Sequence, residues 1–335
     1  MKILVIKPSS LGDVIHALHF LKSVKKTFPD ARVDWVISRD LIGLIEDNPL
    51  INRIHIIDKE SWKRMGNLYK SLSEILSLRK TLRTEHYDLV VDLQGLLRSG
   101  IIAHFASASK TIGFADAREG SRLFYDEHIP IHGISHAVDR CLEAARMLGA
   151  EVKSAECPLS VNVDIRRKIK ELIGNDDEYI IIAPSARWQS KRWPAAYFAS
   201  LISKLTIQCI VIGSKDDMGL VKQIVTETTG NAVNFCGRTD LKELVALISG
   251  SRAVVSNDSG PMHIAAALDI PTIALFGPTD PEKTGPYGWQ SNKKMKVIRA
   301  DIPCSPCRTK DCADLICMDN IKVESVLAEL EEYVN

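Results

Sequence analysis

Short apolar runs rich in β-branched residues alternate along the chain with longer segments of helical period, and this alternation constrains the fold most strongly. Runs of this kind between helices indicate strands of a parallel sheet that is covered on both faces. The pattern begins at the first residues and starts again after Ala150. The predicted strands of the first half are Lys2–Lys7, Arg32–Ile37, Arg53–Ile57 and Asp88–Asp92, and its predicted helices are Val14–Thr27, Asn67–Arg83, Gly95–Phe105 and Ala137–Leu148.

The second half follows a segment without clear periodicity, Glu151–Asn162, which we interpret as a linker. Its predicted strands are Tyr179–Ala183, Gln208–Ile212, Ala253–Ser256 and Thr272–Leu275, and its predicted helices are Pro194–Leu205, Asp217–Thr229, Leu241–Ser249 and Met262–Leu268. A chain of 335 residues is long enough for two domains that each bury a core. We predict doubly wound α/β domains at residues 1–155 and 163–319, with a cleft between the carboxyl ends of their sheets. A last helix, residues 320–335, could pack across either domain.

Composition excludes several classes of protein. The 43 basic and 42 acidic residues give a net charge of +1, so no basic field attracts nucleic acid, and aromatic residues, at 6%, are too few for a base-stacking surface. No apolar stretch approaches the roughly 20 residues of a membrane-spanning helix. The first apolar run stops at Lys7 and Pro8, which is too short for a secretory signal. We therefore expect a cytosolic protein with free thiols.

The loop after the first predicted strand, Lys7–Asp13, contains one glycine instead of the three of a dinucleotide fingerprint, which disfavours NAD binding. Asp13 falls near the start of the following helix. It could cap that helix, because Asp is a preferred capping residue. It could also project from the carboxyl end of the strand as a general base. The spacing alone leaves both interpretations open.

A second strand-to-helix junction, Ser256–His263, has small residues before the helix and Pro261 in position for the first turn. Ser259 or Gly260 would be the capping residue. The free N–H groups and the dipole of such a helix start form an anion site, to which Ser259 and His263 could add donors for a diphosphate. The alternative is a capped helix that binds nothing.

Three cations and two indoles lie in the loop Ser185–Pro194, after the strand that opens the second half. This composition suits a phosphate clamp with an aromatic platform. The loop could equally be solvated, with Trp193 packed against the helix that follows. The carboxylates of the loop Gly213–Asp217 could bind ribose hydroxyls, or they could only start a helix. The loop Phe276–Pro281 could form a second wall of the nucleotide site, or it could be a plain turn.

Two further features could bind ligands. The segment Lys59–Glu85 carries seven Lys and Arg against three Asp and Glu beside an apolar helical face, so it could meet an anionic acceptor or an acidic membrane, or be a solvated amphipathic helix. Four cysteines within fourteen positions could hold Zn²⁺ or an iron–sulfur cluster, although only the first pair is closely spaced. They are Cys304, Cys307, Cys312 and Cys317.

These segments together resemble the bacterial ADP-heptose:lipopolysaccharide heptosyltransferases of glycosyltransferase family 9. The likeness covers nearly the whole chain, and the N-terminal third is most similar to the heptosyltransferase I branch. The matching segments are KPSSLGDVIHALHFL, DLQGLLRSG, GFADARE, NDSGPMHIAAAL, FGPTDP and CSPC. The resemblance implies the GT-B fold, in which two Rossmann-like domains face each other, the first binding mainly the acceptor and the second the ADP-sugar.

The resemblance also implies roles for individual residues in an inverting transfer that needs no metal and no dissociable cofactor. The cysteine run recurs in the family without implying a metal. The catalytic carboxylate falls on Asp13. The nucleotide-sugar-binding residues fall on Ser185, Lys191, Asp258, Ser259, Gly260, Pro261 and His263, and the acceptor-binding residues on Lys63, Arg64 and Arg118.

The implied activity is transfer of L-glycero-D-manno-heptose from ADP-heptose to the Kdo region of lipid A, in lipopolysaccharide inner-core synthesis. Asp13 would deprotonate the acceptor hydroxyl, while Lys191 and the helix at Pro261 hold the leaving ADP. The enzyme would be cytoplasmic and peripheral on the inner membrane, with no nucleic-acid partner. Two alternatives remain: a GT-B enzyme for another nucleotide sugar or acceptor, and a non-catalytic metal-binding protein built on Cys304–Cys317.

Overall fold

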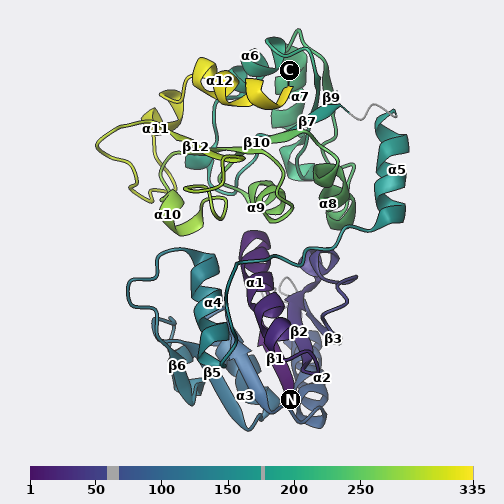
Figure 1. Cartoon of the computed structure of the whole chain (residues 1–335), viewed down its shortest axis with the longest axis vertical. Helices are drawn as coiled ribbons and strands as arrows, with labels where there is room; N and C mark the ends of the chain where they lie inside the picture. Colours follow the sequence, from purple (N-terminus) through teal and green to yellow (C-terminus); the bar gives the residue numbers. More distant parts are fainter. Residues whose placement is uncertain (59–67, 175–177, 335) are drawn as a thin grey trace. The chain divides into compact units, whose positions relative to one another are not determined.

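The computed structural model describes residues 1–58, 68–174 and 178–334, and the chain divides into two compact units, Met1–Ser160 and Val161–Asn335 (Figure 1). The division falls within the segment Glu151–Asn162 that the sequence indicates as a linker. Each unit contains one six-stranded sheet, in which every described strand pair is parallel. Both units are therefore of the doubly wound α/β type that the alternating pattern predicts.

The first unit begins at the centre of its sheet. Its strands are β1 (Lys2–Ile6), β2 (Arg32–Ser38), β3 (Arg53–Ile57), β4 (Leu89–Asp92), β5 (Lys110–Phe114) and β6 (Glu127–Ile129). Its helices are α1 (Leu11–Thr27), α2 (Leu68–Thr84), α3 (Leu97–Ala106) and α4 (Ala137–Met147), with 3₁₀ turns η1 (Arg39–Leu44) and η4 (Ser121–Phe124). The spatial order is β3-β2-β1-β4-β5-β6, so the direction of winding reverses between β1 and β4. At such a reversal the loops at the carboxyl ends diverge and leave room for a ligand.

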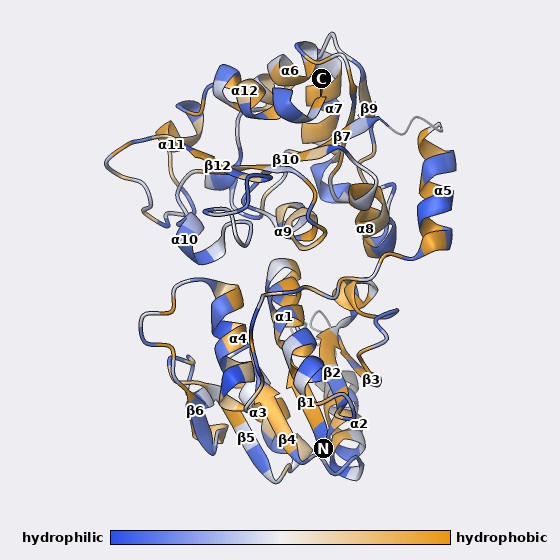
Figure 2. Cartoon of the chain, viewed as in Figure 1, coloured by the Kyte–Doolittle hydropathy of each residue, from blue (hydrophilic) through white to orange (hydrophobic). Residues whose placement is uncertain are grey.

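The central strands of the first unit, β1 and β4, are apolar apart from Lys2 and Asp92 at their ends, because both of their faces are buried; their predominantly orange colour in Figure 2 shows this. Leu4 and Ile6 of β1 join Val90 and Ile102 in a core under α2 and α3. Helices α1 and α4 pack against each other on the other face (Figure 1). The two layers fix the strand ends, and hence the loops at the carboxyl edge.

The second unit repeats this order. Its strands are β7 (Tyr179–Ala183), β8 (Gln208–Val211), β9 (Ala232–Asn234), β10 (Ala253–Asn257), β11 (Thr272–Phe276) and β12 (Met295–Arg299). Its helices are α5 (Val163–Ile173), α6 (Ala195–Ser203), α7 (Met218–Glu227), α8 (Leu241–Ser249), α9 (Gly260–Ala267), α10 (Pro281–Thr284), α11 (Ile316–Asp319) and α12 (Val323–Val334), with 3₁₀ turns η5 (Gln189–Lys191) and η6 (Lys215–Asp217). Read from β9, the order is β9-β8-β7-β10-β11-β12, so the reversal lies between β7 and β10.

The last helix, α12, packs within the second unit. It contacts α6 and the strands β10, β11 and β12, and its Val326 and Leu330 are fully buried in the core with Phe198. The indole N–H of Trp193 donates a hydrogen bond of 2.9 Å to the carbonyl of Ile321. The loop after β7 is thereby attached to the segment that leads into α12.

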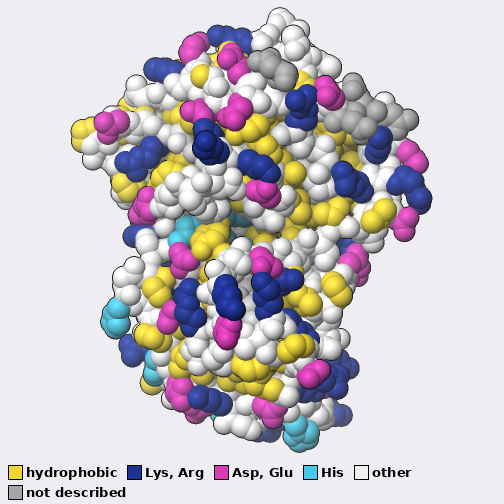
Figure 3. All heavy atoms as spheres, in the orientation of Figure 1, with side chains coloured by type: hydrophobic (Ala, Val, Ile, Leu, Met, Phe, Trp, Pro, Cys, Tyr) yellow, Lys and Arg dark blue, Asp and Glu magenta, His cyan; other side chains and the backbone are white. Residues whose placement is uncertain are grey.

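The surface carries charges of both signs, interspersed on the face shown in Figure 3, in keeping with the net charge of +1. Helices in the described part of the chain are all too short or too polar to cross a bilayer.

Candidate functional site

A small polar pocket of about 190 Å³ lies at the carboxyl edge of the first sheet, where the winding reverses. The loops after β1, β4 and β5 form it together with α1 and α4. Its lining residues are Lys7, Asp13, His16, Leu93, Gln94, Phe114, Arg118, Ala137, Arg140 and Cys141. The structure thus brings together two residues predicted from the sequence, the candidate base Asp13 and the candidate acceptor residue Arg118.

Asp13 is the third residue of α1, because the helix begins at Leu11 and not at Val14. The capping residue is Ser10, so the interpretation of Asp13 as the cap itself is wrong. Asp13 Oδ2 accepts hydrogen bonds of 2.9 Å from both the backbone N–H and the hydroxyl of Ser10, which supports the helix start. The side chain is half-buried at the pocket, and its role as a base stays a prediction.

Three cations share this pocket with Asp13. Lys7 is buried, and its Nζ donates to the carbonyl of Leu93 at 2.7 Å. Arg140 makes two hydrogen bonds to Asp116, of 2.7 and 2.9 Å, and this pairing lowers the pKa of Asp116. Arg118 is exposed at the rim. Neither Lys7 nor Arg140 was predicted as a site residue from the sequence; the position of Lys7 directly after an apolar strand could have indicated it.

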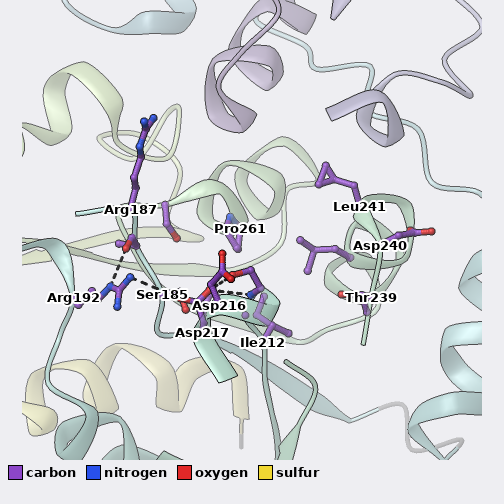
Figure 4. Close-up of a pocket in the computed structure, with 16 residues that line it drawn as sticks. Ser185, Arg187, Arg192, Ile212, Asp216, Asp217, Thr239, Asp240, Leu241 and Pro261 are labelled. Atoms are coloured by element: carbon purple, nitrogen blue, oxygen red, sulfur yellow. Dashed lines mark hydrogen bonds and ion pairs between the residues drawn. The ribbon is translucent and has the colours of Figure 1, made fainter. Parts of the chain in front are cut away.

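A larger pocket of about 490 Å³ occupies the equivalent place in the second unit (Figure 4). The loops after β7 and β8 form it with the first turns of α8 and α9. Its lining residues are Ala183, Ser185, Ala186, Arg187, Arg192, Ile212, Gly213, Ser214, Asp216, Asp217, Thr239, Asp240, Leu241, Leu244, Ser259 and Pro261. In Figure 4, Arg187 and Arg192 lie on one side of the pocket, and Thr239 and Leu241 lie on the other. The segment around Leu241 forms a wall of this pocket that was not predicted from the sequence.

Several polar groups of this pocket are available to a ligand. Ser185 Oγ is shielded from solvent and has no hydrogen-bond partner within the described ranges. Ser259 is the capping residue of α9 and Pro261 lies in the first turn, as predicted, so the first N–H groups of α9 begin at the pocket. Arg192 is held by Nε, which donates to the carbonyl of Ala186 at 2.9 Å.

Lys191 and Asp258 form an ion pair beside this pocket, and neither residue lines it. Lys191 Nζ donates to Asp258 Oδ2 at 2.6 Å, and the hydroxyl of Thr279 donates to the same oxygen at 2.6 Å. The pair is largely buried, with side-chain exposures of 16% and 6%. The ammonium also lies 4.6 Å from the centre of the Trp188 ring. Lys191 is therefore a fixed, paired cation.

The other predicted residues are placed as follows. Gly260 and His263 lie in the first turns of α9, where His263 is buried. Trp193 is 1% exposed and belongs to the core, so the platform interpretation is wrong for this indole. Lys63 and Arg64 lie outside the described residues.

The cysteine run is divided between the surface and the core. Cys304 and Cys307 are exposed, while Cys317 is buried beside Met318 under Gly277. Over the ranges that the structure describes, no three His, Cys, Asp or Glu side chains are grouped as metal ligands would be.

Comparisons with known proteins agree with this geometry. The profile of glycosyltransferase family 9 (heptosyltransferase) matches residues 75–316. The lipopolysaccharide heptosyltransferase 1 of Pseudomonas aeruginosa is 32% identical over 323 residues, covering 93% of this chain and 87% of the relative. The lipopolysaccharide heptosyltransferase 3 of Escherichia coli is 30% identical, covering 80% of each. A structure of the E. coli heptosyltransferase WaaC with ADP has a TM-score of 0.80 at 25% identity and covers 99% of this chain and 100% of its own.

The predicted architecture, two Rossmann-like domains of the GT-B type, is confirmed by the two parallel sheets and by the similarity to the solved structures of WaaC and of E. coli ADP-heptose lps heptosyltransferase II, which also has a TM-score of 0.80 at 25% identity. The matched profile covers well over half of the chain. The protein is a glycosyltransferase, and it belongs to family 9, the heptosyltransferase family.

Proposed function

We propose that the protein is an inverting enzyme that moves L-glycero-D-manno-heptose from ADP-heptose to the Kdo region of lipid A. The names of its relatives support this proposal, because they are lipopolysaccharide heptosyltransferases and one solved neighbour was crystallised with ADP. Heptosyltransferases 1 and 3 have similar sequence identities to this chain. The proposal that the enzyme adds the first heptose therefore rests on the resemblance of the N-terminal third to the heptosyltransferase I branch.

The observation that carries the proposal is the pocket of the second unit. A doubly wound sheet binds nucleotides at this reversal, and the start of α9 offers N–H groups to a diphosphate. The unpartnered hydroxyl of Ser185 and the guanidinium groups of Arg187 and Arg192 lie at the same pocket. Thr239 and Leu241 supply a wall for the base and ribose. The volume of about 490 Å³ lies within the range of small-molecule sites.

The chemistry is a single displacement. Asp13 takes the proton of the acceptor hydroxyl while that oxygen forms a bond to the anomeric carbon of the heptose. The bond from this carbon to the β-phosphate oxygen breaks, and ADP leaves with the electron pair. Lys191 and the N–H groups of α9 stabilise the charge of ADP. The general base contributes about 10²- to 10⁴-fold in rate.

The pocket of the first unit supports an acidic acceptor. Lys7, Arg118 and Arg140 surround Asp13 there, and such cations attract the carboxylates of Kdo. The sequence resemblance assigns Lys63 and Arg64 to acceptor binding as well. An acceptor with lipid chains places the enzyme at the inner face of the cytoplasmic membrane as a peripheral protein. On this proposal the transfer requires no cofactor.

The test is incubation with ADP-heptose and Kdo₂-lipid A, followed by mass spectrometry of the lipid and assay of ADP. We expect one added heptose and one ADP for each lipid converted. Parallel reactions contain a UDP-sugar in place of ADP-heptose, or an acceptor that already carries one heptose. Transfer only in one of these parallel reactions would reject the donor or the acceptor named here, and absence of ADP release in all of them would reject the proposal.

A further inference from the structure

The carboxyl end of β4 holds a buried carboxylate that the proposed binding and catalysis do not use. Asp92 is the last residue of β4 and is 0% exposed. Its Oδ1 accepts from the backbone N–H groups of Gln94, at 2.8 Å, and Gly95, at 3.1 Å. Its Oδ2 accepts from the phenol of Tyr125 at 2.7 Å. Burial raises the pKa of Asp92, and hydrogen bonding from Tyr125, Ser99 and the two backbone N–H groups opposes this effect.

Two glycines make room for the contact between Tyr125 and Asp92. Gly113 of β5 is the direct neighbour of Asp92 across the two strands. A Cβ atom at residue 113 would lie 2.3 to 2.7 Å from three atoms of the Tyr125 ring, so only glycine leaves room for the ring to cross β5. Gly95 has a φ of +68°, which side chains rarely adopt, and it completes the turn that Asp92 holds. The need to accommodate the Tyr125 ring therefore explains the glycine at position 113.

The turn held by Asp92 reaches the loop that carries Asp13 through two bonds. The carbonyl of Leu93 accepts from Lys7 Nζ at 2.7 Å. The side-chain Oε1 of Gln94 accepts from the backbone N–H of Ser9 at 3.2 Å, in the loop that leads into α1. Both bonds join residues about 85 positions apart in sequence, at the two strands between which the winding reverses.

The same turn reaches the loop after β5. The carbonyl of Gly95 accepts from the backbone N–H of Arg118 at 2.9 Å. Tyr125, which binds Asp92 directly, follows the 3₁₀ turn η4 that comes after Arg118. One buried carboxylate is thus connected to every described loop that lines the first pocket at the ends of β1, β4 and β5.

We propose that Asp92 and Tyr125 are positioning residues for the transfer reaction: they fix the turn after β4, and through it the relative placement of Lys7, Asp13 and Arg118. The inference rests on the proposed function, because it assigns the first pocket to the acceptor. Displacing a positioned group by about 1 Å can lower a rate by about 10²-fold. A small movement of this turn therefore suffices to weaken acceptor use while the nucleotide site of the second unit stays intact.

The same sheet contains a matched control pair. The phenol of Tyr87 donates to Asp34 Oδ2 at 2.8 Å, and both residues are buried. His55 Nε2 lies 2.8 Å from the same phenol oxygen. Asp34 lies in the first half of β2 and Tyr87 lies two residues before β4, and neither residue lines the pocket. Removing the Tyr87 hydroxyl deletes a buried Tyr–Asp hydrogen bond of similar length without touching the turn after β4.

The experiment compares Tyr125→Phe and Asp92→Asn with Tyr87→Phe and the wild type. For each protein, kcat and KM are measured separately for the acceptor and for ADP-heptose, with ADP affinity by calorimetry and the melting temperature. We expect Tyr125→Phe to lower kcat/KM for the acceptor about tenfold, and Asp92→Asn to lower it several-fold, because a neutral acceptor holds the turn less strongly. ADP affinity should stay within about twofold of the wild type. Tyr87→Phe should lose comparable stability with unchanged kinetics.

Equal kinetics for Tyr125→Phe and Tyr87→Phe, at comparable melting temperatures, would overturn the proposal. If Tyr125→Phe does not fold, Asp92→Asn takes its place in the comparison with Tyr87→Phe. Unchanged acceptor kinetics in Asp92→Asn would then overturn the proposal. Failure of the wild type to transfer heptose would reject the proposed function instead. The two failures are therefore distinguishable.

Discussion

The fourth strand of each sheet ends in a fully buried polar residue, Asp92 in the first unit and Asn257 in the second. Asp92 only accepts hydrogen bonds, so it gathers the N–H groups of its own turn and the phenol of Tyr125. Asn257 both donates and accepts: its Nδ2 donates to the carbonyl of Pro184 at 2.7 Å, and its Oδ1 accepts from the N–H of Trp193 at 3.2 Å. The carboxylate therefore closes a tight turn, whereas the amide holds both ends of a long loop.

This difference matches the sizes and chemistry of the two pockets. The first is about 190 Å³ and is lined mainly by ionic and polar groups around Asp13. The second is about 490 Å³ and includes the apolar side chains of Leu241, Leu244 and Ile212 beside its polar ones. The same strand order thus supports a small charged site in one unit and a nucleotide-sized site in the other, and the loops decide which.

The largest expected effect tests whether the first pocket is catalytic. Asp13→Asn keeps an oxygen that can accept the two bonds from Ser10 but cannot take a proton, so kcat should fall by roughly 10²-fold or more. Loss of the charge at the helix start should cost only about 0.3–1 kcal/mol. The measurement is kcat and melting temperature on a Kdo-containing acceptor. The matched control is Asp164→Asn, which removes the first-turn carboxylate of α5 and should leave kcat unchanged. Full activity of Asp13→Asn would reject Asp13 as the base.

Acid should destabilise the first unit, because it contains His19, a buried histidine. Burial, with a smaller effect of His136, lowers the pKa of His19 from 6.5 to about 4. The folded state then binds a proton less readily than the unfolded state, so stability is fully present above pH 6.5 and is lost as the pH falls towards 4. The loss reaches about 3 kcal/mol for this residue.

Urea unfolding at pH 7.5 and pH 4.5 measures this effect. In His19→Gln, the free energy of unfolding should depend less on pH than in the wild type. The control is His132→Gln at an exposed position, which should leave the pH dependence unchanged. Equal pH dependence in the wild type and His19→Gln would show that other groups cause the acid sensitivity.

An intermediate effect is expected at the proposed nucleotide site. Lys191→Ala should weaken ADP binding by about 10- to 100-fold, because it removes a charge-assisted interaction worth about 1.5–3 kcal/mol. Among the described residues, the carboxylate of Asp258 then keeps the hydrogen bond from Thr279 as its one side-chain partner, so a lower melting temperature should accompany the loss of ADP affinity. Lys310→Ala is the control, since this ammonium lies over the same Trp188 ring, at 5.3 Å. Calorimetry that finds equal ADP affinity in both variants would remove Lys191 from the site.

The smallest effect concerns thiol reactivity. Hydrogen bonds from Thr309 lower the pKa of the exposed Cys307, while burial raises the pKa of Cys141 to about 11 and of Cys209 to about 12. A maleimide at neutral pH should label Cys307 first, and Cys141 and Cys209 only on unfolding. Mass spectrometry of peptides over time provides the measurement. Early labelling of Cys141 would show that the first unit opens locally around α4.

The strongly apolar strands could be predicted from the sequence within a residue or two, because β1, β4, β7 and β10 lie at the centre of their sheets and are buried on both faces. The strands β6 and β9 were missed because they have three residues each and lie at sheet edges. The strand β5 was missed because Gly113 interrupts its β-branched pattern, and the ring that explains this glycine is twelve residues away.

The candidate site was predicted only in part. Asp13 and Ser259 were found because they follow apolar strands, a position that sequence displays directly. The ion pair of Lys191 with Asp258 joins residues 67 positions apart, and no local pattern predicts it. Similarly, Leu241 lines the second pocket from the start of α8. The apolar residues of this helix are explained by packing in the core, so nothing in the sequence indicated that one of them lines a pocket.

The bond from Trp193 to Ile321 bears on the order in which the two units can fold during synthesis. The loop after β7 obtains this contact only when residues 128 positions later have been made, and the core around Phe198 waits for Val326 and Leu330. The first unit has all of its strands and helices by residue 147. A nascent chain of about half length can therefore already contain a folded first unit, whereas the second unit stays incomplete, with apolar surface open to chaperones, until α12 has left the ribosome.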